Sequence, residues 1–288
     1  MRIKPLAAVP VVLAAALAAV PAHAESAKPP TVPVGTTAAW LVFDRQAGKF
    51  VATRNAHRKY RSASIVKIMI AIDYLERRKN VPAADAKLLR TMLRSSDDDA
   101  ASTFWERGGQ GKIIVRTARK LGLADTTPPP ASKPGFWGYV SLSAYDIVRT
   151  YRYLFDRADP KVRDLILGHL RKATPCGADG FDQTFGIPDA IPRPWAVKQG
   201  WSGFGTTPPS ACKEAKAVGA PISWVAQRAT GSGVPDYGRP VLHTTGLAGQ
   251  GDRYVMAVLT AHPVGGTWSG SVKRITKLTR DLYRSVAG

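Results

Sequence analysis

The hydrophobic pattern of the chain changes from strands to helices and then back to strands. Apolar, strand-forming runs occur at 38–44 and 50–55, and the glycine-containing segment between them has the length of a hairpin loop. Strand patterns return toward the C-terminus, at 195–198, 241–245 and 253–260. The sequence therefore predicts a sheet that takes its strands from both ends of the chain.

The middle of the chain has helical periodicity. The segment 64–75 is apolar on nearly every face and is followed by the cations at 77–79, which predicts a buried helix with a favourable charge at its end. The proline-rich segment 126–137 is expected to be a loop. A final amphipathic helix is expected around 272–286. Further helices are predicted at 83–94, 100–107, 112–121, 143–155 and 160–172.

These elements predict one domain over 37–288, preceded by two segments that lie outside it. Strands at both ends indicate a discontinuous α/β lobe, 37–60 and 194–288, with an all-α lobe at 61–193 inserted into it. Residues 25–36 are polar and proline-rich and are expected to form a linker.

Residues 1–24 have the features of a secretory signal peptide. Two cations precede an alanine-rich apolar stretch, and Ala22-His23-Ala24 supplies the small residues of a cleavage site. Pro10 interrupts the apolar stretch, which is shorter than the roughly 20 residues needed to span a bilayer, so no stable membrane insertion is expected after cleavage. No cysteine follows that stretch directly, so lipid attachment there is not expected. The sequence predicts a secreted, extracytoplasmic protein.

Charge and cysteine content fit this location. The chain has 41 Lys and Arg against 21 Asp and Glu, a net charge of +20, which favours anionic partners such as a wall polymer. Nucleic acid is not expected, because an exported chain without a recognisable binding motif has no access to it. The two cysteines, Cys176 and Cys212, are expected to form a disulfide outside the cytoplasm.

Ser64 and Lys67 are the first candidates for chemistry. They lie one turn apart at the start of the predicted buried helix, where a permanent charge is expensive and the free amine of a lysine is favoured. Such an amine can take the proton of a serine and make it a nucleophile. The alternative is structural, with Ser64 as a helix cap and Lys67 reaching the surface. A second pair of the same spacing, Ser210 and Lys213, lies in a polar loop.

Two further segments, together with the Ser64 and Lys67 pair, form a set of three candidate motifs. The segment 95–101 (SSDDDAA) joins two predicted helices, and 195–201 (WAVKQGW) is a predicted strand with Lys198 followed by Gly200. In this order, the three resemble the Ser-x-x-Lys, Ser-Asp-Asn and Lys-Thr-Gly motifs of the class A β-lactamases and penicillin-binding proteins. The resemblance covers essentially the whole predicted mature chain. It implies an α/β fold with an antiparallel sheet flanked by helices and an inserted all-α lobe.

The resemblance also implies roles for individual residues. Ser64 would attack a carbonyl to form an acyl-enzyme with Lys67 as its base, and Ser96 would relay a proton to the leaving nitrogen. Lys198 would supply positive potential for a substrate carboxylate, and Gly200 would leave room for the substrate. The oxyanion hole would combine the Ser64 N–H with an N–H near Trp201 or Ser202.

Several positions depart from the family pattern. Asp98 stands where the family has asparagine, and Gln199 stands where it has threonine, so both substrate contacts are altered. Trp201 is expected to line the substrate groove together with Trp137. The loop 126–143 contains no acid where class A enzymes place the glutamate that activates the deacylating water, and the only glutamate between Asp99 and Lys198 is Glu106. Efficient β-lactam turnover is therefore not expected.

The function we expect is that of an exported serine hydrolase acting on an amide or ester near a carboxylate, in a small-molecule or peptidoglycan-like substrate. Two alternatives remain open: a true class A β-lactamase, or a catalytically inactive protein that binds an anionic wall polymer. No metal site or cofactor is predicted, because the histidines show neither an H-E-x-x-H pattern nor a cluster with cysteine.

Overall fold

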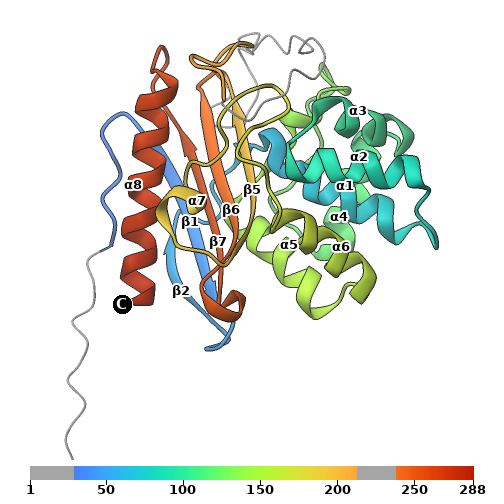
Figure 1. The fold of residues 1–288 in the computed structure, drawn as a ribbon, viewed down its shortest axis with the longest axis horizontal. Helices are drawn as coiled ribbons and strands as arrows, with labels where there is room; N and C mark the ends of the chain where they lie inside the picture. Colours follow the sequence, from blue (N-terminus) through green and yellow to red (C-terminus); the bar gives the residue numbers. More distant parts are fainter. Residues whose placement is uncertain (1–28, 213–237) are drawn as a thin grey trace, which may run out of the picture.

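A five-stranded antiparallel sheet is the centre of the computed structural model, which describes residues 29–212 and 238–288 (Figure 1). Its strand order is β2-β1-β7-β6-β5. The strands are β1 (Thr37–Asp44), β2 (Lys49–Arg54), β5 (Trp195–Ser202), β6 (Val241–Ala248) and β7 (Tyr254–Ala261). The predicted sheet with strands from both ends of the chain is confirmed. The predicted signal peptide and the first linker residues lie outside the described residues.

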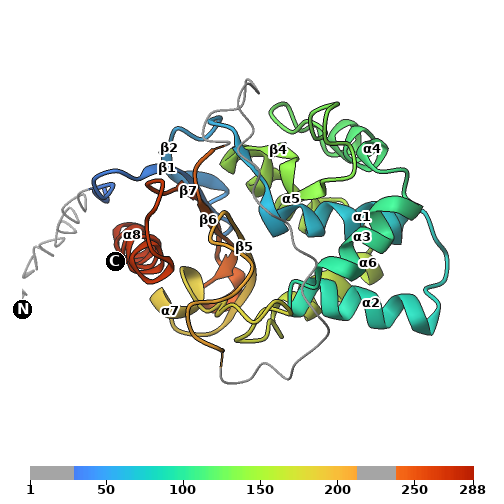
Figure 2. The ribbon, with the colours of Figure 1, turned by 90° about the horizontal axis from the view of Figure 1, so that it is seen from above.

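Both faces of the sheet are covered, and alternate side chains of β1 belong to different hydrophobic cores. Leu41 and Phe43 belong to the core shared with the helical lobe, whereas Trp40 and Val42 belong to the core beneath α8. The helix α8 (Trp268–Ala287) lies along the sheet on the side away from the other long helices (Figures 1 and 2). Because both faces are buried, β1 is a nearly continuous apolar run.

The helical lobe lies on the opposite side of the sheet and has α1 in its middle (Figure 2). Its helices begin and end within a few residues of the predicted positions. They are α1 (Lys67–Glu76), α2 (Ala83–Arg94), α3 (Asp98–Arg107), α4 (Gly111–Leu121), α5 (Ala144–Asp156) and α6 (Pro160–Leu170). Residues Ile68 to Ile72 of α1 are almost completely buried, as expected for a helix that is apolar on nearly every face.

Short elements complete the fold. They are β3 (Tyr60–Arg61), η1 (Ala63–Val66), η2 (Trp137–Tyr139), β4 (Ser141–Leu142), α7 (Ile187–Ala190) and η3 (Gln250–Asp252). The helix α7 lies within 61–193, the predicted helical lobe, but packs against α8, β5 and β6. In the described part of the chain, no helix has the length and apolar character needed to cross a membrane.

Candidate active site

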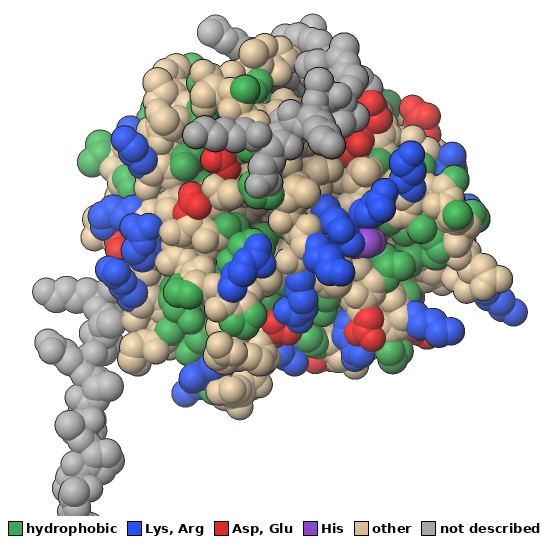
Figure 3. All heavy atoms as spheres, in the orientation of Figure 1, with side chains coloured by type: hydrophobic (Ala, Val, Ile, Leu, Met, Phe, Trp, Pro, Cys, Tyr) green, Lys and Arg blue, Asp and Glu red, His purple; other side chains and the backbone are tan. Residues whose placement is uncertain are grey.

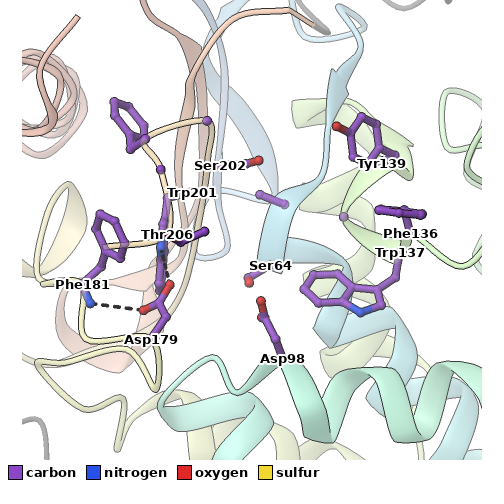
Figure 4. Close-up of a pocket in the computed structure, with 15 residues that line it drawn as sticks. Ser64, Asp98, Phe136, Trp137, Tyr139, Asp179, Phe181, Trp201, Ser202 and Thr206 are labelled. Atoms are coloured by element: carbon purple, nitrogen blue, oxygen red, sulfur yellow. Dashed lines mark hydrogen bonds between the residues drawn. The ribbon is translucent and has the colours of Figure 1, made fainter. Parts of the chain in front are cut away.

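A cavity opens where η1, the start of α3 and the end of β5 meet (Figure 4). It encloses about 820 Å³, including its solvent-open part. Ser64 lies at its floor, with Trp137 on one side and Trp201 on the other (Figure 4). The other described lining residues are Ala63, Asp98, Phe136, Gly138, Tyr139, Asp179, Phe181, Ser202, Gly203, Phe204, Gly205 and Thr206.

Ser64 and Lys67 face each other because of the local backbone. Ser64 lies in the 3₁₀ turn η1, where side chains three residues apart are eclipsed. The Nζ of Lys67 is 2.9 Å from the Oγ of Ser64, and the lysine is completely buried. The structural alternative is therefore wrong: Ser62 occupies the cap position, and Lys67 does not reach the surface.

The Lys67 ammonium has three oxygen acceptors. Besides Ser64 Oγ, it donates to the backbone carbonyl of Ser96 at 2.5 Å and to Oδ1 of Asp98 at 2.6 Å. The ring of Trp137 lies 4.6 Å from the same nitrogen. An ammonium has three N–H groups for these acceptors, and the Oγ of Ser96 at 3.5 Å is a fourth, more distant one. Asp98, whose side chain is 36% exposed, is the counter-ion and faces the cavity.

Ser96 links the two buried lysines. It lies between α2 and α3, where Asp97 caps α3 by accepting from the Ala100 N–H at 2.9 Å. Its φ of +61° is left-handed, an unfavourable conformation for serine of the kind that concentrates at functional sites. Its Oγ accepts from Lys198 Nζ at 2.7 Å and lies 3.5 Å from Lys67 Nζ. The Nζ of Lys67 is thus within hydrogen-bonding reach of both predicted serines, Ser64 and Ser96.

Lys198 is placed differently from the expectation. Its side chain is buried behind Ser96 and does not line the cavity, and its Nζ also donates to the Gln199 carbonyl at 3.1 Å. Burial, followed by the nearby Lys67 charge, holds the pKa of Lys198 well below its usual value. Lys198 therefore contacts the cavity lining only indirectly, through Ser96, and its predicted role toward a substrate carboxylate stays a prediction.

Gln199 and Gly200 also do not line the cavity, which corrects their expected contact with substrate. Neighbouring strand residues point to opposite faces, so Gln199 turns away from Lys198 and donates to the Phe185 carbonyl. Gly200 faces η1, and a Cβ there would lie 3.0 Å from Ile65 Cγ1 and 3.2 Å from the Ser62 carbonyl. The glycine thus allows β5 to approach the turn that carries Ser64.

Asp179 is a cavity residue that the sequence reasoning missed. Its carboxylate accepts from Trp201 Nε1 at 2.9 Å and from the Phe181 N–H at 3.2 Å, contacts visible across the cavity from Ser64 (Figure 4). Burial raises the pKa of Asp179, and the Asp98 charge raises it further. No motif spacing marks this residue, because it lies in an irregular segment between α6 and α7.

Solved structures with this arrangement of elements are known. A PBP-A mutant in an acyl-enzyme complex with penicillin G aligns over 88% of this chain and 90% of its own, with a TM-score of 0.61 and 16% identity. The β-lactamase from Sphaerobacter thermophilus aligns over 88% and 92%, with a TM-score of 0.61 and 16% identity. The class A β-lactamase from Mycobacterium abscessus aligns over 88% and 95%, with a TM-score of 0.60 and 19% identity. The chain has the class A β-lactamase fold.

Sequence relatives are fewer. A protein described as "Putative lipoprotein LppW" from Mycobacterium tuberculosis is 36% identical over 189 residues, and the same protein name from Mycobacterium bovis matches equally. The match spans 63% of this chain and 59% of the relative's length. No family model matches the chain.

The β-lactamase-like fold has a disulfide beside its cavity. Cys176 and Cys212 are bonded, which confirms the predicted pairing. The bond connects the segment of Asp179 with the segment that follows β5, and Cys212 N–H also donates to the Gly180 carbonyl at 3.4 Å. The cavity wall formed by Asp179 and Phe181 is therefore tied to the wall formed by residues 203–206.

The remaining candidates do not belong to the cavity. Glu106 is exposed on α3 and does not line the cavity. Ser210 is exposed, and its partner Lys213 lies outside the described residues. Over 29–212 and 238–288, no three His, Cys, Asp or Glu side chains are grouped closely enough to hold a metal ion.

Proposed function

We propose that this protein is an active-site serine hydrolase that forms an acyl-enzyme on Ser64. The observation that carries the proposal is the 2.9 Å contact between the Oγ of Ser64, at the floor of a cavity, and the amine of a completely buried lysine. A lysine that served only structure would gain nothing from this costly burial. Its position against a serine in a cavity suits nucleophilic catalysis.

In the proposed reaction, Ser64 Oγ attacks a carbonyl carbon and Lys67, as free amine, takes the hydroxyl proton. The carbonyl oxygen becomes an oxyanion held by the backbone N–H of Ser64 and one near Trp201 or Ser202. When the carbon–nitrogen or carbon–oxygen bond breaks, Ser96 gives its proton to the leaving atom and recovers one from a neighbouring lysine. The resulting ester on Ser64 is then hydrolysed by water.

The ion pair between Lys67 and Asp98 opposes the first step, in which Lys67 takes the proton of Ser64. Lys67 can accept a proton only after its ammonium has lost one, and the carboxylate 2.6 Å away stabilises the ammonium. Asp98 and Asp179 also face the cavity with negative charge, so substrates that carry a carboxylate there are disfavoured relative to neutral amides and esters.

Slow release of the acyl group is also part of the proposal. The loop that passes the cavity at Phe136 and Trp137 has no acid between 126 and 143 to activate water. Asp179, which lies across the cavity and does not pair with Lys67, is a candidate base, and its raised pKa makes it basic enough to accept a proton. A penicillin that reacts with Ser64 should thus remain bound for longer than in an efficient β-lactamase.

We propose an extracytoplasmic location. Support comes from the disulfide between Cys176 and Cys212, which persists in oxidising compartments, and from the relatives described as lipoproteins. A small amide or ester, or a peptidoglycan-like peptide, is the substrate class that suits this setting.

The test is mass spectrometry of the full chain after exposure to a penicillin and, separately, to an activated ester. The expected result is one added acyl group on Ser64, absent in Ser64→Ala and retained in Ser210→Ala, which removes the serine of the other Ser-x-x-Lys pair. Absence of label at Ser64 with every probe would overturn the proposal. Rapid hydrolysis of nitrocefin would instead favour a true class A β-lactamase.

A further inference from the structure

Four basic residues gather on one face of the helical lobe. Arg90 and Arg94 lie near the C-terminal end of α2, and Lys172 follows α6, whose last turn holds His169. Arg90 and Lys172 are exposed, and Arg94 and His169 are half-buried. Figure 3 shows a band of Lys and Arg side chains beside a histidine over this part of the molecule. We call these four residues the α2–α6 patch.

The positive charge of the α2–α6 patch is not compensated within the described part of the chain. No carboxylate there forms an ion pair with Arg90, Arg94 or Lys172. Elsewhere on the surface compensation is common: Arg171, the residue before Lys172, pairs with Asp252 at 2.5 Å. The three uncompensated cations therefore form a local excess, distinct from the general positive charge of the protein.

His169 lies beside these cations, and their charge affects its protonation. Its Nδ1 accepts a hydrogen bond from Nε of Arg94 at 3.1 Å, which requires the unprotonated nitrogen. Burial, followed by the charges of Arg94, Arg90 and Lys172, lowers the pKa of His169 to about 4. An anion bound among these cations would reduce their effect, so the titration of His169 can serve as a local probe of occupancy.

We propose that the α2–α6 patch is a docking surface for a linear, phosphate-rich polymer. Two of its three cations are arginines, whose planar guanidinium groups match phosphate oxygens in a bidentate manner. Among the described residues, the exposed large apolar side chains are Val34, Phe50, Val115, Phe136 and Val264. None of them lies on α2 or α6, which argues against insertion into a bilayer and against the base stacking that single-stranded nucleic acids require.

The patch is directly connected to the candidate active site. The carbonyl of Arg94 accepts from the Thr174 N–H at 3.1 Å, and that of Ser95 accepts from the Ala178 N–H at 2.6 Å. The residues that follow, Ser96 and Asp179, belong to the site itself. A polymer bound to the α2–α6 patch would thus keep the candidate active site close to that polymer. The docking does not depend on any reaction of Ser64.

Binding of the full chain to inorganic polyphosphate over a series of salt concentrations tests the proposal. Because each lost phosphate contact removes affinity and salt dependence, Arg90→Gln/Arg94→Gln/Lys172→Gln should bind at least about tenfold more weakly, with a salt slope smaller by about 3. The control is Lys273→Gln/Arg280→Gln/Arg284→Gln on α8, which has the same change in net charge and should lose less than about threefold.

Two further measurements identify the binding site and the ligand. Polyphosphate should raise the pKa of His169, followed by NMR, above its unliganded value of about 4, because it offsets the charges of Arg94, Arg90 and Lys172 but not the burial. Ser64→Ala should bind polyphosphate with unchanged affinity. A failure of acylation and a failure of docking can therefore be told apart. Equal losses in the two triple variants, an unmoved His169, or tighter binding to phosphatidylglycerol vesicles or single-stranded DNA than to polyphosphate would each overturn the proposal.

Discussion

The Nζ of Lys67 and Oδ1 of Asp98 lie 2.6 Å apart, so the presumed base of the reaction is neutralised by a carboxylate that faces the cavity. In the family that the motifs resemble, a neutral asparagine stands at this position. The substitution places a charge where the family has only a dipole.

Asp98→Asn should accelerate acylation of Ser64. Loss of the carboxylate destabilises the Lys67 ammonium relative to the amine, and we expect about a tenfold faster reaction at neutral pH. Pre-steady-state acylation by a penicillin and by a neutral ester measures this. Asp99→Asn, which removes an exposed charge one residue away, should change little, and slower acylation in Asp98→Asn would contradict the assignment.

Ser96→Ala should distinguish amides from activated esters. An amine leaves only when protonated, whereas a nitrophenolate leaves without a proton, so the loss should be about a hundredfold for an amide and below about tenfold for the ester. Acylation rates of Ser64 with the two substrates give the ratio. An equal loss for both would mean that Ser96 only holds the two lysines in place.

Gly200→Ala should destabilise the protein and displace the nucleophile. Its Cβ would approach Ile65 Cγ1 to 3.0 Å, and we expect a loss of about 1–3 kcal/mol in the free energy of unfolding, with slower acylation. Gly168→Ala in α6 is the matched control, because nothing lies within 4 Å of its added Cβ. Ala is a better helix former, so this control should be stabilised by up to about 1 kcal/mol. Urea denaturation compares the two.

His243 should make stability fall on acidification. Its Nδ1 accepts from the Thr260 N–H at 3.3 Å, Nε2 lies 2.9 Å from the Arg61 carbonyl, and burial lowers the folded-state pKa to about 4. The unfolded state, with an ordinary pKa near 6.5, therefore binds the extra proton between these values. From pH 7 to pH 5 this histidine should cost about 2 kcal/mol of unfolding free energy.

The measurement is urea denaturation of wild type and His243→Gln at both pH values. The variant should lose less stability between them, whatever its stability at pH 7. The control His57→Gln removes a histidine whose side chain is 64% exposed and lies 2.8 Å from Asp125, so it should not reduce the loss of stability on acidification. A steeper loss in His243→Gln than in wild type would contradict the assignment.

Periodicity predicted the fold well because most elements bury an apolar face. The nearly continuous apolar sequence of β1 is compatible with few structures other than a buried strand, and that of α1 with few other than a buried helix. The terminal helix has a clear apolar stripe. The short α7 was missed, since four residues are too few to show a period.

The site was predicted in part, and the reasons differ from residue to residue. Ser64, Lys67 and Ser96 meet as expected, because the motif order fixes which elements carry them. Strand alternation alone could have shown that Gln199 points away from Lys198. The ion pair of Asp98 and the position of Asp179 depend on how separate segments pack, which no local pattern contains.

The strand order has a consequence for how the protein folds. Thr37 of β1 pairs with Ala261 of β7, and Ser96 meets Lys198 across 102 residues. Contacts of such long sequence separation form slowly, because the intervening chain must first be ordered. Until β7 is in place, β1 has an open edge that invites association with other chains. The contact between Ser96 and Lys198 is thus formed late, and an incompletely folded chain would carry Ser64 and its local partner Lys67 without that support.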